Sequence, residues 1–250
     1  VGWNWTASAY NTRVVFRNGI YGVVSSMKNI EDAHNDPNAL FIDIGAKSKE
    51  DALKYVHVGS VCGYCGEYLP LANDLVCSKT FDDRVGCFQL IEALRENDGT
   101  YPNDIYYVFT VQEEVGCRGS KTTAAFIKPD IGIAVDVTPA HDYPCDLTGS
   151  NAIGKGIGIK VADPSVLCHE DVIAVMEQCC RHKDIPFQYE VIDKGGCDAS
   201  SMNLSNFGVR AGGISVVTRY AHCSSSVISK EDAESGIRLC TAFSKYEFQF

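Results

Sequence analysis

The segment FTVQEEVGCRG, residues 109–119, ends an apolar run with two adjacent carboxylates, Glu113 and Glu114. Two like charges at the end of a buried strand repel one another, and each is costly to remove from water. A solvated turn is one explanation, because acidic pairs usually face solvent. The alternative is a site that needs both carboxylates and binds cations between them.

Other acidic residues and a histidine follow the same pattern. Asp82 and Asp83 stand just before a helix expected to begin near Arg84, Asp136 ends the apolar run in IAVDVT, and His222 follows the run ISVVT. Each has a structural explanation as well: either aspartate could cap the helix, and a single histidine is more often structural than a ligand. Together, carboxylates and an imidazole without a thiolate indicate a site for zinc, manganese or cobalt.

The elements that position these residues alternate between strands and helices from about residue 71 onward. Apolar runs predict buried strands, and Val85, Phe88, Ile91 and Leu94 recur at helical spacing. The expected order is helix 84–97, strand 104–111, helix 120–127, strand 130–137, helix 170–183, strand 187–192, strand 211–218 and helix 229–246. This alternation predicts an α/β fold with a mainly parallel central sheet flanked by helices, in which ligands bind beyond the carboxyl ends of the strands.

Residues 1–70 have a different character and predict a small β-rich module. The turn signal Asn18-Gly19 lies between two short β-type runs and indicates a hairpin, and ALFIDIGA indicates another strand. Ser48 opens a capping box for a short helix. We therefore expect one module over residues 1–70 and a larger domain over residues 71–250.

Composition excludes several classes of protein. The formal net charge of -10 argues against a nucleic-acid binder or a protein that binds anionic membranes. No apolar run reaches membrane-spanning length. Of the 12 cysteines, only Cys62 and Cys65 form a CxxC pair, which is insufficient for a ribbon-type zinc site. Without a recognisable export signal, reduced thiols and a cytoplasmic location are the expectation.

Five ordered motifs carry a family resemblance: FDDRVG (81–86), FTVQEEVGCRG (109–119), IAVDVT (133–138), GGCDA (195–199) and TRYAHC (218–223). With LFIDIGAKSKEDA (40–52), they resemble the M42 family of co-catalytic metalloaminopeptidases, the tetrahedral (TET) glutamyl or deblocking aminopeptidases, whose relatives are sometimes labelled endoglucanases. The resemblance implies a zinc-peptidase-like catalytic domain interrupted by a β-rich dimerisation domain. Residues 1–70 would be the later part of that inserted domain, so the chain is expected to be truncated at its N-terminus.

The resemblance also implies a role for each site residue. Asp82 would bridge two metals, with a cis peptide bond to Asp83, and Glu113 would be the general base. Glu114 and His222 would bind one metal, and Asp136 the other. The second metal's last protein ligand would be a histidine in a GHxD-type motif, which this sequence lacks.

The implied reaction is hydrolysis of the first peptide bond of a peptide with two divalent ions per subunit, zinc or cobalt first and manganese as a further candidate. The family usually assembles into dodecamers, so a homo-oligomer is expected. Gly196 and Asp198 are substrate-pocket candidates, although Asp198 in a tight turn that hydrogen-bonds backbone is an equal alternative. A glycoside hydrolase, which also uses paired carboxylates, and an inactive assembly subunit are the competing interpretations.

Overall fold

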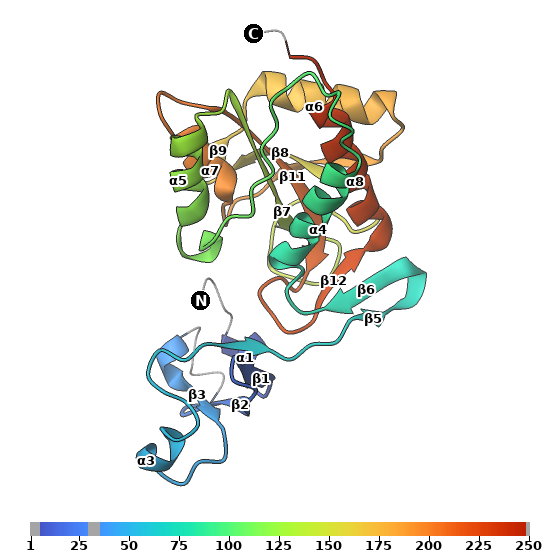
Figure 1. Ribbon diagram of the computed structural model, residues 1–250. Coiled ribbons are helices and arrows are strands. Elements are labelled where there is room, and N and C mark those ends of the chain that lie inside the picture. The colour runs from blue at the N-terminus through green and yellow to red at the C-terminus, as the bar shows by residue number, and fades with distance from the viewer. Residues whose placement is uncertain (1–5, 30–35, 249–250) are drawn as a thin grey trace. The chain divides into compact units, whose positions relative to one another are not determined.

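The structure is a computed structural model of the 250-residue chain that describes residues 6–29 and 36–248. The chain divides into two compact units. The smaller consists largely of the described residues up to Leu69, and the larger consists largely of residues from Phe81 onward (Figure 1).

The smaller unit is built on a four-stranded antiparallel sheet with strand order β3-β2-β1-β4. The expected hairpin forms: β1 (Arg13–Phe16) pairs with β2 (Tyr21–Ser26), and Gly19 in the turn has a φ of 89°. Ser48 caps the short helix as predicted, accepting the Asp51 backbone N–H at 3.1 Å. The other elements are α1 (Thr6–Ala9), η1 (Pro37–Ala39), β3 (Leu40–Asp43), α3 (Lys49–Ala52) and β4 (Cys62–Tyr64).

The two faces of this small sheet differ in burial. Val14 and Val24 are buried in a core that also includes Ala9. On β2 the alternate residues point the other way, and Tyr21 and Val23 keep 68% and 43% of their surface exposed. Because alternate strand residues face opposite sides, one sheet face packs internally and the other presents apolar side chains.

The larger unit has a mixed sheet with the order β10-β8-β11-β12-β6-β5, to which β7 adds beside β11 and β9 beside β8. The pairs β7–β11 and β8–β10 are parallel, whereas β8–β11 and β11–β12 are antiparallel. Its elements are β5 (Leu69–Pro70), η2 (Ala72–Asp74), β6 (Leu75–Ser78), α4 (Phe81–Arg95), η3 (Glu113–Val115), α5 (Arg118–Ile127), β7 (Ile131–Pro139), β8 (Ile157–Asp163), β9 (Val166–Leu167), α6 (Glu170–His182), β10 (Phe187–Val191), α7 (Asp198–Asn203), β11 (Arg210–Arg219), β12 (Ser226–Ser229) and α8 (Lys230–Ser244).

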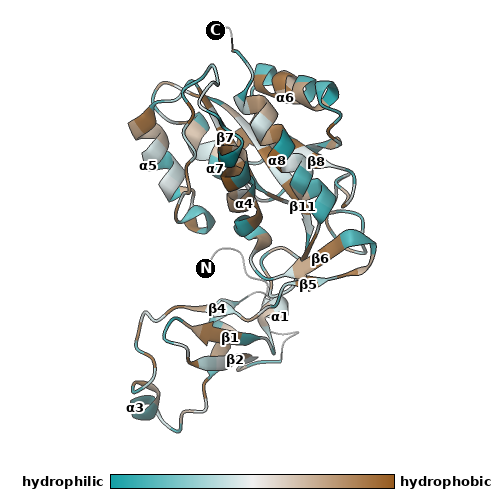
Figure 2. Ribbon diagram, turned by 45° about the vertical axis from the view of Figure 1, so that its right-hand side comes forward, coloured by the Kyte–Doolittle hydropathy of each residue, from teal (hydrophilic) through white to brown (hydrophobic). Residues whose placement is uncertain are grey.

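Helices cover the sheet and enclose the main core. The helices α4, α6 and α8 pack on the strands and on one another, while α7 packs on β7 and β11 and carries α5 against it (Figure 1). Along these helices hydrophobic and hydrophilic residues alternate, as the colours of α6 show (Figure 2). Ile159, Met176 and Leu239 are fully buried in this core. The predicted α/β class, a central sheet flanked by helices, is confirmed, with a mixed sheet.

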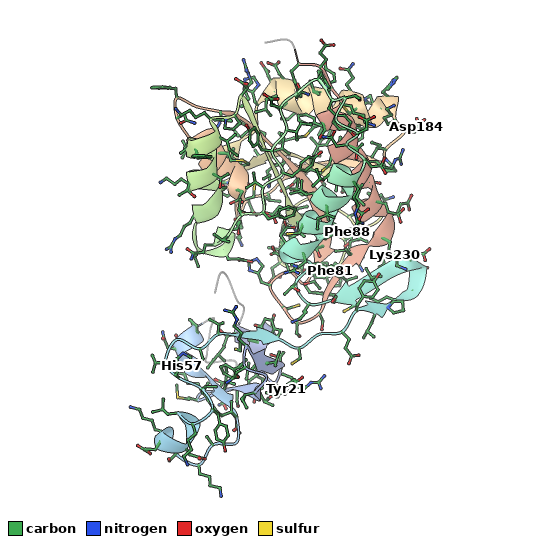
Figure 3. All side chains as sticks on the ribbon, in the orientation of Figure 1. Tyr21, His57, Phe81, Phe88, Asp184 and Lys230 are labelled. Carbon is green, nitrogen blue, oxygen red and sulfur yellow. The ribbon has the colours of Figure 1, made fainter. Side chains whose placement is uncertain are left out.

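Two expected features of the larger unit differ from the structure. Residues 104–111 form no strand, and a cavity of about 820 Å³ is lined by this segment and by β7. The helical stripe of Phe88, Ile91 and Leu94 does not face the core, and Phe88 keeps 49% of its surface exposed (Figure 3). The buried face of α4 is formed instead by Val85, Gln89 and Ala93, which pack toward α8 and β7.

Two further findings concern the cysteines and the lengths of the helices. All 12 cysteines are unbridged thiols. None of the helices in the described part of the chain has the length and apolar character needed to cross a bilayer.

Candidate active site

Asp82 and Asp83 lie at the start of α4, where the backbone is not yet helical. The peptide bond between them is cis, as the family resemblance implies. Asp83 Oδ1 accepts the Gly86 backbone N–H at 3.0 Å, so Asp83 caps the helix. Gly86 makes this approach possible, because a Cβ at that position would come within 2.4 Å of the Asp83 carboxylate. Asp83 is therefore fixed by the helix terminus, and its neighbour Asp82 projects from a rigid backbone.

Glu113 and Glu114 lie in a single 3-10 turn, η3, directly after the extended segment 104–111. Left-handed residues bracket the turn, with φ of 59° at Gln112 and 50° at Cys117. The Glu113 carbonyl accepts the backbone N–H groups of Gly116 at 2.9 Å and Cys117 at 2.8 Å. The chain reversal therefore holds both glutamates in one closed turn, where an apolar run and an acidic pair had predicted a strand end.

Asp136 lies on β7, which corresponds to the strand expected over residues 130–137. β7 runs parallel to β11 and aligns Asp136 with Ser215. The carboxylate of Asp136 is half-buried and accepts the Val137 backbone N–H at 2.7 Å.

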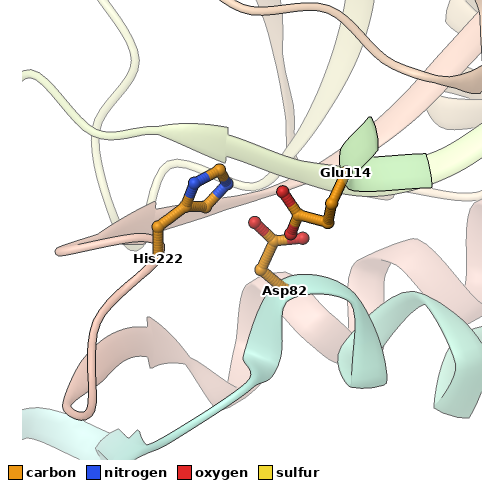
Figure 4. Close-up of side chains that lie close together, drawn as sticks. All are labelled: Asp82, Glu114 and His222. Atoms are coloured by element: carbon orange, nitrogen blue, oxygen red, sulfur yellow. The ribbon is translucent and has the colours of Figure 1, made fainter. Parts of the chain in front are cut away.

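Three of the predicted ligands converge. Ligand atoms of Asp82, Glu114 and His222 all lie within 4.8 Å of one another, and their side chains point toward a common space (Figure 4). His222 comes from the connection between β11 and β12 and has a left-handed φ of 60°. Across the described residues, Asp136 is not among the groups that meet this distance, although its electrostatic neighbours include Asp82.

Three carboxyl groups of this region have raised pKa values. Burial, together with Asp82, Asp198 and Glu113, raises the pKa of Asp83 to about 8. Burial and the charges of Asp83 and Asp82 raise the pKa of Asp136 well above its usual value. Burial also raises the pKa of Glu113, with Asp198 and Glu114 contributing. A divalent cation would relieve this repulsion, and the oxygen and nitrogen donors of the Asp82 group fit such an ion.

Asp198 opens α7 and is held by side chains of other segments. Its two oxygens accept hydrogen bonds from Thr110 Oγ1 at 2.7 Å and Ser120 Oγ at 2.6 Å. Asp198, Glu113 and Cys117 form a second group whose ligand atoms lie within 4.8 Å of one another. Gly196, just before it, passes close to another loop, since a Cβ there would meet Ser165 Oγ at 2.7 Å. Asp198 thus joins the loop before α7 to the Glu113 turn.

A buried ion cluster that sequence reasoning missed supports the same loop. The Lys160 ammonium on β8 pairs with Glu190 on β10 and lies 3.2 Å from Asp163, and all three side chains are at most 2% exposed. The Cys197 thiol, directly before Asp198, donates to Asp163 Oδ2 at 3.9 Å. Burial disfavours the ammonium, but Glu190 and Asp163 outweigh it and raise the pKa of Lys160. The only sequence signal was a lysine within the apolar run GIGIKVA.

Three other histidines in the described part of the chain have the following surroundings. The ring of His57, in the smaller unit, hydrogen-bonds to Ser60 Oγ at 2.6 Å (Figure 3). His169 caps α6 by accepting the Asp171 backbone N–H at 3.3 Å. The ring of His141 lies directly over Gly149.

A central sheet covered by helices, with carboxylates and a histidine gathered at its loops, defines a hydrolase of the zinc-peptidase-like class. The profile of the M42 glutamyl aminopeptidase family matches residues 1–239. A protein of Acetivibrio thermocellus named "Putative aminopeptidase" is 42% identical over 228 residues, which cover 91% of this chain and 68% of that protein.

Two solved structures are similar along almost the whole chain. The aminopeptidase APDkam598 of Desulfurococcus kamchatkensis superposes with a TM-score of 0.89 at 35% identity, covering 99% of this chain and 72% of that one. The TET1 peptidase of Pyrococcus horikoshii, which can assemble into a tetrahedron or a large octahedral shell, superposes with a TM-score of 0.83 at 29% identity and covers 99% of this chain and 76% of that one. The chain therefore belongs to the M42 family of aminopeptidases, which are metal-dependent peptide hydrolases.

Proposed function

We propose that the protein is a dinuclear metal aminopeptidase that removes N-terminal residues from peptides, with Glu113 as the general base. The observation that carries this proposal is the group of Asp82, Glu114 and His222, whose ligand atoms lie within 4.8 Å of one another beside the Glu113 turn. Carboxylate oxygens and an imidazole nitrogen suit zinc or cobalt, and manganese is a further candidate.

Each residue of the site has a separate role in the proposed reaction. Asp82, Glu114 and His222 would hold one ion, and Asp136 together with Asp82 would hold the second. Bound ions at these positions would lower the pKa of a water molecule and polarise the scissile carbonyl. Glu113 takes a proton from the attacking water and returns it to the leaving amine. The raised pKa of Glu113 supports this role, because a base with a pKa nearer neutrality both accepts and returns a proton efficiently.

Glu113→Gln is the decisive variant, because glutamine keeps the shape of the side chain and cannot take up the proton. We expect metal content to stay close to wild type and turnover of aminoacyl-p-nitroanilides to fall by about 10²- to 10⁴-fold. Glu234→Gln, on the exposed side of α8, is the matched control and should leave turnover unchanged. Near-normal activity of Glu113→Gln in the full-length protein with added zinc, cobalt or manganese would overturn the assignment.

The same assay separates the competing functions. A glycoside hydrolase needs an acid and a nucleophile but no histidine ligand, so the Asp82–Glu114–His222 group favours the peptidase. Release of sugar from a β-glucan without peptidase activity would establish the glycosidase instead. Absence of both activities in the metal-loaded protein would identify an inactive assembly subunit.

We further propose that residues 1–70 belong to the β-rich dimerisation domain, that residues 71–250 form the catalytic domain, and that the protein forms a homo-oligomer. The apolar side chains of Tyr21 and Val23 on the outer face of the small sheet support a protein contact there. The tetrahedron and octahedral shell of the Pyrococcus horikoshii TET1 peptidase, and the dodecamer recorded for PhTET1-12s, support assembly into a dodecamer. Light scattering on the full-length protein tests this, and a monomeric mass at micromolar concentration would overturn it.

A further inference from the structure

Cys117 hydrogen-bonds to both the backbone and the side chain of Glu113. Its backbone N–H donates to the Glu113 carbonyl at 2.8 Å, and its thiol donates to Glu113 Oε1 at 3.3 Å. The contact depends on the left-handed backbone of Cys117, which has a φ of 50° and a ψ of 41°. A non-glycine residue in this region is uncommon and costs about 1 kcal/mol. The turn therefore holds Cys117 in a costly conformation that directs its thiol to the Glu113 carboxylate.

The thiol is itself held in place by neighbouring elements. Ser200 Oγ on α7 donates to Cys117 Sγ at 3.9 Å. Ser120 Oγ lies 3.0 Å from the Cys117 carbonyl oxygen and 2.6 Å from Asp198 Oδ1, two acceptors that share its single O–H donor. Burial and the adjacent Glu113 carboxylate raise the pKa of Cys117 to about 12. Around neutral pH the group therefore remains a protonated S–H donor and is a poor nucleophile.

We propose that Cys117 is a positioning residue for Glu113, an inference that rests on the proposed role of Glu113 as general base. The thiol fixes Oε1, which leaves Oε2 oriented to receive the proton of the attacking water. A carboxylate has rotational freedom about its last bond, and a general base is effective only within hydrogen-bond reach of the proton it takes. The thiol removes that freedom without introducing a second charge beside the carboxylates.

The test uses Cys117→Ala and Cys117→Ser in the full-length, metal-loaded protein. Both replacements adopt the left-handed backbone at similar cost, so they differ mainly in the presence of a donor. We expect Cys117→Ala to lower kcat by roughly 3- to 30-fold with KM and metal content unchanged, the range expected for one hydrogen bond. Cys117→Ser should recover part of the loss. Cys145→Ala, in an exposed loop, is the control and should behave as wild type.

A kcat for Cys117→Ala equal to that of Cys145→Ala would overturn the inference, as would a Cys117→Ser variant no more active than Cys117→Ala. If Glu113→Gln is inactive while Cys117→Ala is unaffected, only the positioning role fails. If Glu113→Gln remains active, the general-base assignment fails and the positioning role fails with it.

A measurement without turnover tests the contact directly. The infrared difference spectrum between wild type and Cys117→Ala isolates the S–H stretching band of Cys117. We expect this band at lower frequency than those of the other thiols, because hydrogen-bond donation weakens the S–H bond, and we expect it to rise in Glu113→Ala. A band that Glu113→Ala does not move would overturn the inference even in a preparation without activity.

Discussion

Removing bound metal should make the stability of this protein fall as pH rises from about 5 to about 8. Asp83 is the main cause, because burial and neighbouring carboxylates raise its pKa from 3.8 to about 8 in the folded state. In this window the folded protein keeps a proton on Asp83 that the unfolded chain has lost. A raised folded-state pKa contributes stability that is complete below the unfolded pKa and is lost as pH rises through the folded pKa.

The magnitude follows from the difference in bound protons. One proton corresponds to about 1.4 kcal/mol per pH unit, so one group changes the unfolding free energy by up to about 4 kcal/mol over three units. Burial and the charges of Asp83 and Asp82 also raise the pKa of Asp136, so the pH dependence belongs to the two carboxyl groups as a pair. We therefore expect a loss of about 2–4 kcal/mol in the metal-free protein.

Urea unfolding in the presence of a chelator, at several pH values across this range, measures the effect. Asp83→Asn should flatten the slope, because asparagine still caps α4 at Gly86 but carries no titrating proton. Added zinc, cobalt or manganese should also flatten it, since a bound cation favours the ionised carboxylates. A metal-free stability that stays constant or increases between about pH 5 and 8 would refute this account of the carboxylate cluster.

Two further substitutions test the buried ion cluster around Lys160 and the proposed role of Asp82 as the ligand that bridges both metals. Lys160→Met should lower the unfolding free energy by about 3–5 kcal/mol, because it leaves the carboxylates of Glu190 and Asp163 buried without their cation. The exposed control Lys155→Met should change the unfolding free energy by no more than about 0.5 kcal/mol, and equal values for the two variants in urea titrations would contradict the prediction. Asp82→Ala should lower the content of both metals, measured by elemental analysis, and a variant that keeps two ions per chain would exclude Asp82 as the bridging ligand.

Hydrophobic pattern and capping signals predicted much of the fold, but not which strands form. The helix over 229–246 and the strand over 211–218 correspond to α8 and β11, which have local signals of their own. β8 was not anticipated, because Lys160 interrupts its apolar run and one of the two carboxylates that pair with it, Glu190, is 30 residues away in sequence. Residues 104–111 are the opposite case, a predicted strand that does not form. Their apolar run is typical of a strand, but a strand also needs a neighbouring strand to pair with. The sequence of the segment itself does not show whether such a neighbour is present.

In the candidate site as well, features of single segments could be predicted from the sequence, whereas contacts between distant segments could not. Acidic residues at the ends of predicted strands and at a helix start indicated Asp82, Glu114 and Asp136 as members of one site, because segment ends meet at one edge of an α/β sheet. The hydroxyl groups that hold Asp198 could not be found in this way. Thr110 and Ser120 lie 88 and 78 residues from Asp198, and neither residue type is distinctive in sequence.

The acidic pair of η3 illustrates how one turn can separate two identical side chains. Glu114 belongs to the group with Asp82 and His222, whereas Glu113 belongs to the group with Cys117 and Asp198. The first group brings together oxygen and nitrogen ligand atoms, and the second includes a thiol donor. A straight strand would have sent neighbouring side chains to opposite faces of a sheet, so only one of them could have reached the site. The left-handed residues that bracket the turn allow one segment to place Glu114, the proposed metal ligand, beside Glu113, the proposed base that contacts Cys117.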